Sequence, residues 1–404
     1  MLLTLAWRNI WRNKKRSLII ITAIAVGLCC GLFASATMFG MWDSMINTTI
    51  DRDLGHFQIH SKDFEDEKLI SDTIPNFENV ISTIKKSKYV TGISSRIMIE
   101  GMASSASTSN GVRIIGINPG NEKNVTSIYK QVVDGSYFTE DFKNQIVIGE
   151  KLADNLGLHI KSKIILSFQG TDGSIIYGAF RIAGIFKTES SVFDKSNVFV
   201  KENDLQNLLN SSIFSNEIVV RLTSVQVADS VYIPIKYQFS NLSVKNWGEL
   251  APELKLFNDM LMTQMNIFLG IILFALLFGI TNTMLMSVME RVREFGVLMA
   301  VGMKRSRVFF MIMFETISLS FIGGIAGLIL ALILIQYFGS VGINLSAFTE
   351  GLSQWSLGTR LYTSLPFSFY PPLVLMILVT AVLGAFYPAI KAIKLNPSNA
   401  IRTY

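Results

Sequence analysis

The chain has 404 residues, of which 50% are hydrophobic and only 16% are charged, and its formal net charge is +6 at pH 7. A soluble globular domain carries about 25% charged residues, so this composition is typical of a membrane protein. The excess of basic over acidic residues lies in three short segments, before residue 17, between 290 and 307, and after 388. Basic clusters beside apolar runs are typical of cytoplasmic loops, so we expect a lipid bilayer as partner and no nucleic acid.

Four apolar runs are long enough to cross a bilayer, which takes about 20 helical residues. We expect transmembrane helices at 17–42, 264–289, 308–339 and 369–390. The segments 1–16, 290–307 and 391–404 then share one side, opposite 43–263 and the short loop 340–368. Because the three basic clusters fall on one side, both termini are predicted to be cytoplasmic in a multi-pass protein of the inner (plasma) membrane.

Residues 1–36 allow a second interpretation, a cleaved signal peptide, since a basic start and an apolar middle precede "ASA". The apolar run continues through Met38, Phe39 and Trp42, which favours a retained helix. Cleavage would also leave the large domain outside the cytoplasm, so the charge pattern does not distinguish a signal peptide from a retained helix. Cys29 and Cys30 are adjacent within this run and are interpreted as packing residues.

The region 43–263 is predicted to be an extracytoplasmic domain of mixed α/β fold. Strands are indicated by alternating apolar runs near 56–61, 111–119, 145–150, 163–168, 179–186 and 197–201. Helices are indicated at 77–87, 150–158 and 202–210. About 200 residues suffice for a core without disulfides, and we expect about two subdomains.

Little in this sequence indicates catalysis. His56 and His60 lie on one face of a predicted strand, but no third metal ligand is evident, and a half-exposed strand explains them better. The stretch "AVGMKRS" has Met303 between Gly302 and Lys304, so it is not a phosphate-binding loop. We therefore expect no enzyme activity, no metal and no cofactor bound directly, with ATP and Mg in a separate subunit.

The segment 290–307 carries a short helical signal of its own. Apolar residues recur from Val292 to Val301, Gly302 ends the turn, and basic residues flank the segment. A helix this short needs a partner surface to be stable. One interpretation is that its apolar face docks in a groove of a partner protein, and the other is that it rests on lipid headgroups.

Glu315 is predicted about eight residues into the third span, roughly 12 Å deep at 1.5 Å per residue. A charge at that depth should face protein or pair with another charge. We expect it to pair with Arg307 or another base of the loop. A role in relaying motion is the alternative hypothesis.

Three stretches resemble the MacB/LolCE/FtsX family of ABC-transporter permeases. They are the loop "MERVREFGVLMAVGMKRSRVFFMIMFE", the C-terminal "YPAIKAIKLNPSNAIR" and the N-terminal "LAWRNIWRNKKRSLIIITAIAVG". The stretch "DGSYFTEDFKNQIVIGEKLADNLGLHIKSKI" is similar to the external core domain of the same family. The resemblance covers nearly the whole chain in the right order.

The resemblance implies four spans with a large MacB-like external domain, a second permease as partner (an identical or a paralogous chain), and a separate ATPase dimer. It places an ATPase-coupling helix in the 290–307 loop, with Phe295, Val297 and Leu298 as the contacting apolar side chains. The residues expected to form this contact are Glu290, Arg291, Arg293, Glu294, Phe295, Gly296, Val297, Leu298, Gly302, Lys304 and Arg305.

Within the family, the segments flanking spans one and two look most like LolE-type permeases, which implies release of lipoproteins and a periplasmic chaperone or adaptor. MacB-like efflux with an adaptor, and FtsX-like signalling to a cell-wall hydrolase, are the alternatives. A possible entrance for acyl chains consists of Met38, Met41, Met45, Met262 and Met265. The flexible side chain of methionine suits acyl chains of different shapes, but ordinary packing between helices explains the same residues.

Overall fold

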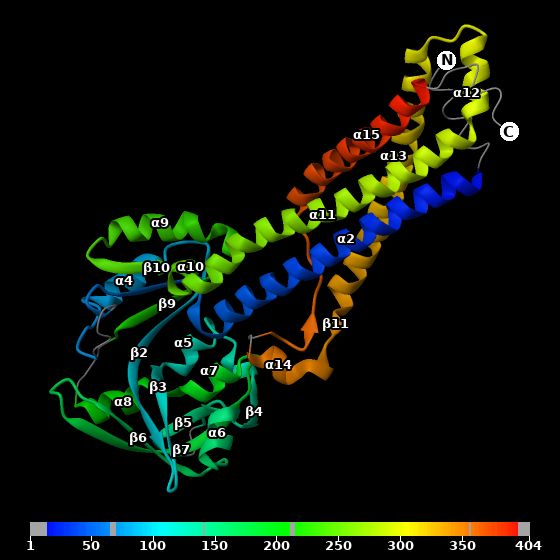
Figure 1. The fold of residues 1–404 in the computed structure, drawn as a ribbon. Coiled ribbons are helices and arrows are strands. Elements are labelled where there is room, and N and C mark those ends of the chain that lie inside the picture. The colour runs from blue at the N-terminus through cyan, green and yellow to red at the C-terminus, as the bar shows by residue number, and fades with distance from the viewer. Residues whose placement is uncertain (1–13, 65–69, 140–141, 211–214, 355–356, 395–404) are drawn as a thin grey trace. The chain divides into compact units, whose positions relative to one another are not determined.

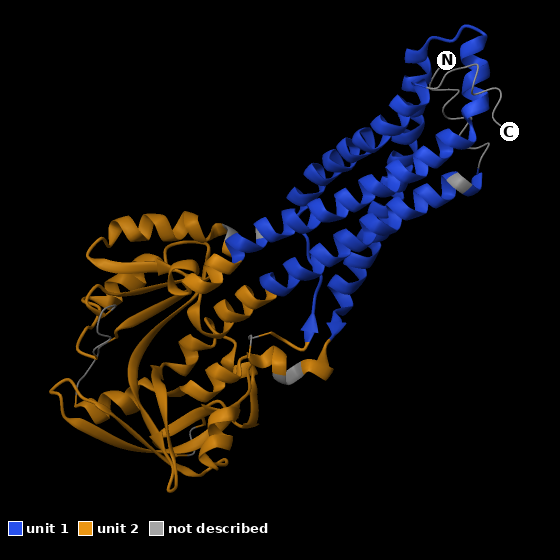
Figure 2. Ribbon diagram, in the orientation of Figure 1, with its two compact units in different colours: residues 1–43, 258–344, 360–404 blue, residues 44–257, 345–359 orange. Residues whose placement is uncertain are grey.

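The structure, a computed structural model, describes residues 14–64, 70–139, 142–210, 215–354 and 357–394. The chain divides into two compact units, which Figure 2 colours separately. The helical unit comprises 1–43, 258–344 and 360–404, and the core domain comprises 44–257 and 345–359. The core domain thus includes part of the loop between the third and fourth spans, which sequence reasoning had kept apart.

Four long helices of the described chain are apolar enough to cross a membrane (Figure 1). They are α2 (Lys14–Thr49), α11 (Pro252–Glu290), α13 (Arg305–Val341) and α15 (Tyr370–Ile393). The first two are longer than the predicted spans because hydropathy detects only the part of a helix that suits lipid. Shorter elements of the unit are α12 (Val292–Ala300), β11 (Ile343–Asn344), β12 (Arg360–Leu361) and η5 (Phe367–Phe369).

Small residues bring the helices of this unit close together. A Cβ added at Gly327 would lie 2.7 Å from the carbonyl oxygen of Ala25, so α13 approaches the backbone of α2 there. One added at Gly384 would lie 2.9 Å from the Ile280 side chain of α11. Packing of this kind holds helices together in lipid, where no hydrophobic force drives them. Cys29 is buried in the same packing, whereas Cys30 is exposed on the helix surface, so the packing interpretation holds for Cys29 alone.

The core domain contains one mixed sheet, ten-stranded in the described residues, in the order β10-β1-β9-β2-β3-β8-β5-β7-β4, with β6 paired to β2 and β7. β3 pairs with β8 and β5 with β7 in parallel, and the other pairs are antiparallel. The strands are β1 (Phe57–Ser61), β2 (Val90–Ser104), β3 (Ser109–Ile117), β4 (Val132–Gly135), β5 (Gln145–Gly149), β6 (Lys163–Gln169), β7 (Ile175–Phe186), β8 (Asn197–Lys201), β9 (Glu217–Leu222) and β10 (Leu242–Asn246).

The core domain also contains eight short helices in its described residues. They are α4 (Phe77–Ile84), α5 (Pro119–Glu122), α6 (Glu150–Leu156), α7 (Ser191–Ser196), α8 (Glu202–Leu209), α9 (Ala228–Gln238), α10 (Trp247–Leu250) and α14 (Thr349–Gln354). Single turns occur at η1 (Ile50–Leu54), η2 (Ile128–Lys130), η3 (Val225–Val227) and η4 (Ser346–Phe348). The predicted mixed α/β domain is confirmed. Its core separates into clusters, one around β1, β9 and β10 with α4 and α9, and others around the remaining strands.

Candidate functional site

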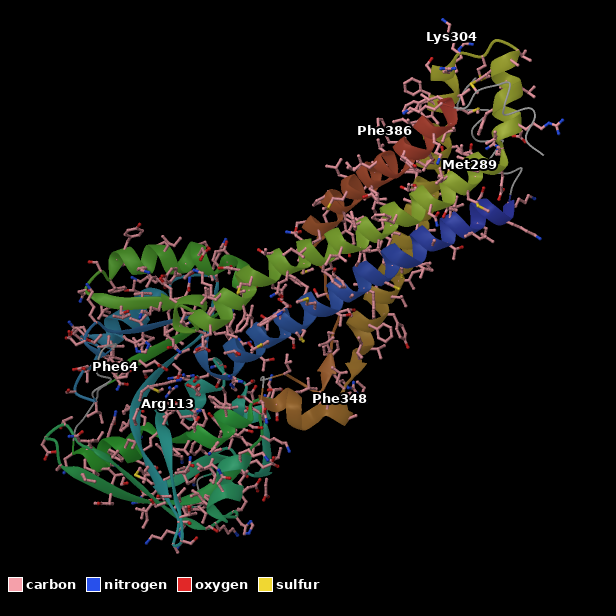
Figure 3. The ribbon with its side chains drawn as sticks, in the orientation of Figure 1. Phe64, Arg113, Met289, Lys304, Phe348 and Phe386 are labelled. Atoms are coloured by element: carbon pink, nitrogen blue, oxygen red, sulfur yellow. The ribbon has the colours of Figure 1, made fainter. Side chains whose placement is uncertain are left out.

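The segment between the second and third spans forms a helix, as its sequence predicts. α12 begins directly after Arg291 and ends at Ala300, and α13 begins at Arg305. Gly302 between them has φ +100°, a conformation that glycine adopts without strain. The turn therefore ends α12 and presents Lys304, labelled in Figure 3, at the end of the helical unit.

One face of α12 is buried within the chain itself. The Phe295 side chain is only 1% exposed, and Leu298 packs partly against the same cluster. That cluster draws residues from all four long helices: Ile20, Ile24, Ile280, Met284, Val288, Val308, Met311, Ile312, Leu319, Ala389 and Ala392. The structure therefore corrects the expected role of Phe295, which anchors α12 to the helical unit and is not free to contact a partner. The family resemblance indicated a contacting helix, but it did not reveal which apolar side chains pack against the chain's own helices.

The opposite face of α12 is open to a partner. Val297 is 46% exposed and Val301 is 84% exposed, and the two lie four residues apart, so they share one side of the segment. Gly296 is buried with Phe295. The exposed residues of the predicted contact set are Glu290, Arg293, Glu294, Val297, Gly302, Lys304 and Arg305. This coupling surface, defined as Arg293, Val297, Val301 and Lys304, is a small apolar patch with bases beside it.

Arg291 connects the start of α12 to the third span. Its Nη1 atom donates to both carboxylate oxygens of Glu315 at 3.1 Å, and its Nε atom donates to Glu294 at 3.0 Å. The guanidinium carbon lies 5.1 Å from the centroid of the Phe295 ring. Glu315 therefore does pair with a base of the loop, but the base is Arg291 and not Arg307. Arg291 is buried to 8% exposure, so it belongs to the anchor and not to a rim of charges.

The methionines of the expected acyl-chain entrance do not form one exposed set. Met265 is 3% exposed and packs inside the helical unit. Met38 and Met41 of that unit are half-buried, as is Met45 in the core domain. The side chain of Met262 lies outside the described residues. Helix packing accounts for Met265, and an entrance remains a prediction for the others.

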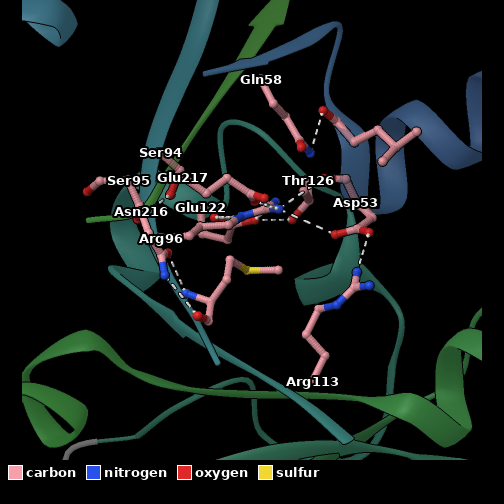
Figure 4. A network of polar contacts seen from close by, with 12 residues as sticks. Asp53, Gln58, Ser94, Ser95, Arg96, Arg113, Glu122, Thr126, Asn216 and Glu217 are labelled. Carbon is pink, nitrogen blue, oxygen red and sulfur yellow. Dashed lines mark hydrogen bonds and ion pairs between the residues drawn. The ribbon is translucent and has the colours of Figure 1, made fainter. Parts of the chain in front are cut away.

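A buried ion network stands where the first long helix enters the core domain (Figure 4). Arg96 on β2 is fully buried and donates to Glu122 at 2.7 Å, to Glu217 at 2.9 Å and to Asp53 at 3.3 Å. Burial by itself would lower the pKa of Arg96, but the carboxylates of Glu122, Glu217 and Asp53 outweigh it and raise the pKa above its ordinary value. The guanidinium thus stays charged and joins β2, β9, α5 and η1.

Three consecutive charged residues of η1 point to different parts of the domain. Asp51 accepts from Arg221 of β9 at 2.7 Å, and Asp53 contacts Arg96 and, at 4.0 Å, Arg113. Arg52 lies over the ring of Phe193, 4.8 Å from its centroid. Sequence reasoning missed this junction, although an acid–base–acid triplet right after an apolar run was a visible signal.

His56, just before β1, and His60 on β1 are structural. Both are buried, at 5% and 7% exposure, so the expectation of a half-exposed strand is wrong. Nδ1 of His56 accepts from the Leu222 backbone N–H at 3.2 Å, and the His60 ring stacks on Phe64. Burial, with help from the charge of Arg221, lowers the pKa of His56 to about 4. No group of three or more candidate metal ligands occurs in the part of the chain that the structure describes.

Comparison with known families accounts for this architecture. Residues 17–232 match the model of the MacB-like periplasmic core domain, and residues 266–397 match that of the FtsX-like permease C-terminal. The chain belongs to the MacB/FtsX family of ABC transporter permeases. It is accordingly a membrane protein, with four apolar helices and a MacB-like domain between the first and second. α12 lies within the region that matches the FtsX-like model.

Individual relatives are distant. The macrolide export ATP-binding/permease protein MacB of Chlorobium luteolum is 31% identical over 31% of this chain and 16% of its own length. The chain thus matches only about a sixth of the length of such relatives. An uncharacterized ABC transporter permease of Bacillus subtilis, YvrN, is 23% identical over 98% of both chains. The solved periplasmic region of MacB from Actinobacillus actinomycetemcomitans covers 49% of this chain and 92% of its own at 13% identity, with a TM-score of 0.34.

Proposed function

We propose that this permease carries motion from a separate ATPase dimer, which holds ATP and Mg, to its core domain on the extracytoplasmic side of the membrane. The observation that supports this most is the coupling surface. Two exposed valines beside Arg293 and Lys304 suit a groove on a partner, while the far side of the same helix is anchored by Phe295 and Arg291. A push on α12 would thus reach all four long helices.

The connection to the core domain supports the same proposal. The span that contains α2 runs for 38 residues, Ser17–Leu54, or about 57 Å at 1.5 Å per residue. The hydrocarbon layer is about 30 Å thick, so the helix extends well past it. Its last turn, η1, is fixed to the core domain by Asp51 and Asp53. Displacement of the helix would therefore be passed to the sheet through ion pairs and not through a loose linker.

For the substrate, we propose release of lipoproteins from the membrane, with a chaperone or adaptor on the outer side. The segments after span one and before span two carry this proposal, since they resemble LolE-type permeases. Export of a small molecule or peptide is the second candidate, because relatives named for macrolide export match the chain. Either activity needs a second permease. The exposed apolar side chains of α11, among them Ile267, Ile271 and Phe274, suit such a partner or lipid.

The decisive experiment reconstitutes the permease with its ATPase in proteoliposomes. We expect a lipidated protein to stimulate ATP hydrolysis, and a macrolide or a peptide not to. Stimulation by macrolide alone would favour export. Absence of any response, together with intact binding of the ATPase, would favour a signalling role.

The coupling surface is tested in the same system with Val301→Asp. A buried, unpaired carboxylate at the contact should cost several kcal/mol and abolish ATPase binding. Val133→Asp, which places the same charge on an exposed valine of the core domain, is the matched control. Leu298 is unsuited to this test because it packs partly inside the chain. Full coupling in Val301→Asp would show that the ATPase binds elsewhere.

A further inference from the structure

The core domain contains a cavity that none of the preceding roles explains. It has a volume of about 450 Å³ and is lined by groups from η1, β2, β3, α7 and the start of β8, including Arg52, Glu100, Arg113, Ser190, Phe193 and Asn197. Ligand sites in proteins occupy about 300–1,000 Å³, so the size fits a small molecule or a group of a larger one. All of the lining belongs to one unit, the core domain.

Arg52 is the unusual residue of this cavity. It is 8% exposed, and its Nε and Nη1 atoms are buried with no hydrogen-bond partner among the described groups. Among the described residues, the flat guanidinium group packs on the ring of Phe193. A buried guanidinium normally pairs with an anion, because its donors lose water and gain nothing in return.

The acids that act on Arg52 electrostatically do not fill this role. They are Asp53, Glu189 and Asp194. Asp194 accepts from the backbone N–H and hydroxyl of Thr188, Asp53 pairs with Arg96 and Arg113, and Glu189 accepts from Gln131. Each carboxylate thus has its own donor, and none lies within hydrogen-bond distance of Arg52 in the described structure.

Two further groups complete a binding site. Arg113, 40% exposed, faces the same cavity and lies at the edge of the network shown in Figure 4. Asn197 is buried, and its Oδ1 atom accepts no hydrogen bond from the described residues, although its amide nitrogen donates to Phe193. The cavity therefore offers two cationic donors and the free acceptor of Asn197, beside the exposed carboxylate of Glu100. With two arginines and one carboxylate, the charged lining is cationic by one. This set suits an oxyanion that also carries a hydroxyl or N–H donor.

We propose that the cavity beside Arg52 binds an oxyanion, either a carboxylate or a phosphate group, on the outer side of the permease. Arg52 holds the anion in a charge-assisted pair, Arg113 adds a second cation at the mouth, and Asn197 accepts from the ligand. The site lies next to η1, so a bound anion would stiffen the junction between the first long helix and the sheet. The proposal is independent of which substrate is moved and needs no ATPase for its test.

The test uses the full-length permease in detergent, with inorganic phosphate and acetate as probes. Thermal unfolding is followed while each anion replaces chloride at constant ionic strength. Because a ligand that binds only the folded state raises its stability, the melting temperature should rise along a one-site curve. A response to phosphate alone assigns a phosphate site, a response to acetate alone assigns a carboxylate site, and a response to both assigns the shared oxyanion chemistry.

Variants decide whether the response comes from this cavity. Arg52→Gln should weaken binding about tenfold or more, because it removes a charged hydrogen-bond donor. Arg113→Gln should cause a smaller loss of anion affinity. It provides the test of the site if Arg52→Gln fails to fold. Lys151→Gln removes an exposed charge of α6, outside the cavity, and should leave binding unchanged. The proposal is overturned if neither anion shifts the melting temperature beyond chloride, or if both arginine variants respond like the unaltered protein.

Discussion

The ion pair between Arg291 and Glu315 joins the residue that precedes α12 to α13. Both side chains are 9% exposed, and the pair is supported by Glu294 and by the ring of Phe295. A buried pair of this kind contributes more to fixing one arrangement than to net stability. We therefore interpret it as the element that sets the angle at which α12 leaves the membrane.

Breaking this pair should be far more harmful than replacing it. Glu315→Gln leaves a buried arginine with half its neutralising charge gone, and we expect a loss of about 3–5 kcal/mol in the free energy of unfolding. The double variant Arg291→Met with Glu315→Leu removes both charges and should recover most of that loss. Thermal unfolding of the purified permease measures both. Equal destabilisation in the two variants would contradict this expectation. It would mean that stability requires the ion pair itself, and not merely the absence of an unpaired buried charge.

Two buried groups of the core domain give opposite dependences on pH. The folded pKa of His56 is lowered from 6.5 to about 4, so the unfolded chain binds the extra proton first and stability falls as pH decreases through that window. The folded pKa of Asp194 is raised from 3.8 to about 6, chiefly by burial, so the folded chain binds the extra proton and stability rises over nearly the same window. The two effects should partly cancel.

Single variants separate these contributions. His56→Gln should remove the fall, so that stability increases from pH 6 to pH 4 relative to the unaltered protein. Asp194→Asn should make the fall steeper, approaching about 1.4 kcal/mol per pH unit, the limit for one proton. Denaturant unfolding at several pH values measures the slopes. Identical slopes in all three proteins would contradict both assignments.

At the scale of elements, the turn after α12 determines how the exposed residues at the end of this helix are oriented. Gly302 has φ +100°, and a Cβ at this position would meet no described atom within 4 Å. The glycine is therefore required by backbone conformation and not by crowding. The turn sets the direction in which Val301 and Lys304 are presented.

Gly302→Ala should therefore impair coupling more than folding. The strain of a non-glycine residue in such a conformation is about 1–3 kcal/mol, which the segment can relieve by reorienting α12. We expect ATPase stimulation to drop severalfold while the melting temperature changes by a few degrees. Gly279→Ala, on α11 with the same open surroundings, is the control and should leave both unchanged. Normal stimulation in Gly302→Ala would show that the turn does not govern presentation.

At the scale of the whole molecule, the sidedness of the membrane is the central prediction. The basic clusters predict that 290–307 lies in the cytoplasm and the core domain outside it. Cysteines introduced at Lys123 and Lys304, both exposed, report on each side after Cys29 and Cys30 are replaced by serine. A membrane-impermeant maleimide should label position 123 in intact spheroplasts and position 304 only after permeabilisation. The reverse pattern would invalidate both the orientation and the proposed function.

The sequence by itself determined the parts that depend on local composition. Apolar length fixed the four long helices, and alternation located β1, β3 and β5 to β8, because hydropathy and period act within a few residues. It overlooked β2, β9 and β10, whose runs mix polar and apolar residues and gain their strand character from pairing with β1 and with each other. The ends of α2 and α11 that extend beyond the apolar spans were also missed, because hydropathy detects only the part of a helix that suits lipid.

Only the tertiary structure decided which side of each element meets which neighbour. The family resemblance implied the same contacting role for Phe295 and Val297, but packing against four helices buries the first and leaves the second exposed. The partner of Glu315, the anchoring of Asp51 and Asp53, and the unpaired donors of Arg52 all join residues far apart in the chain. Such pairings depend on long-range geometry, which no window of the sequence contains.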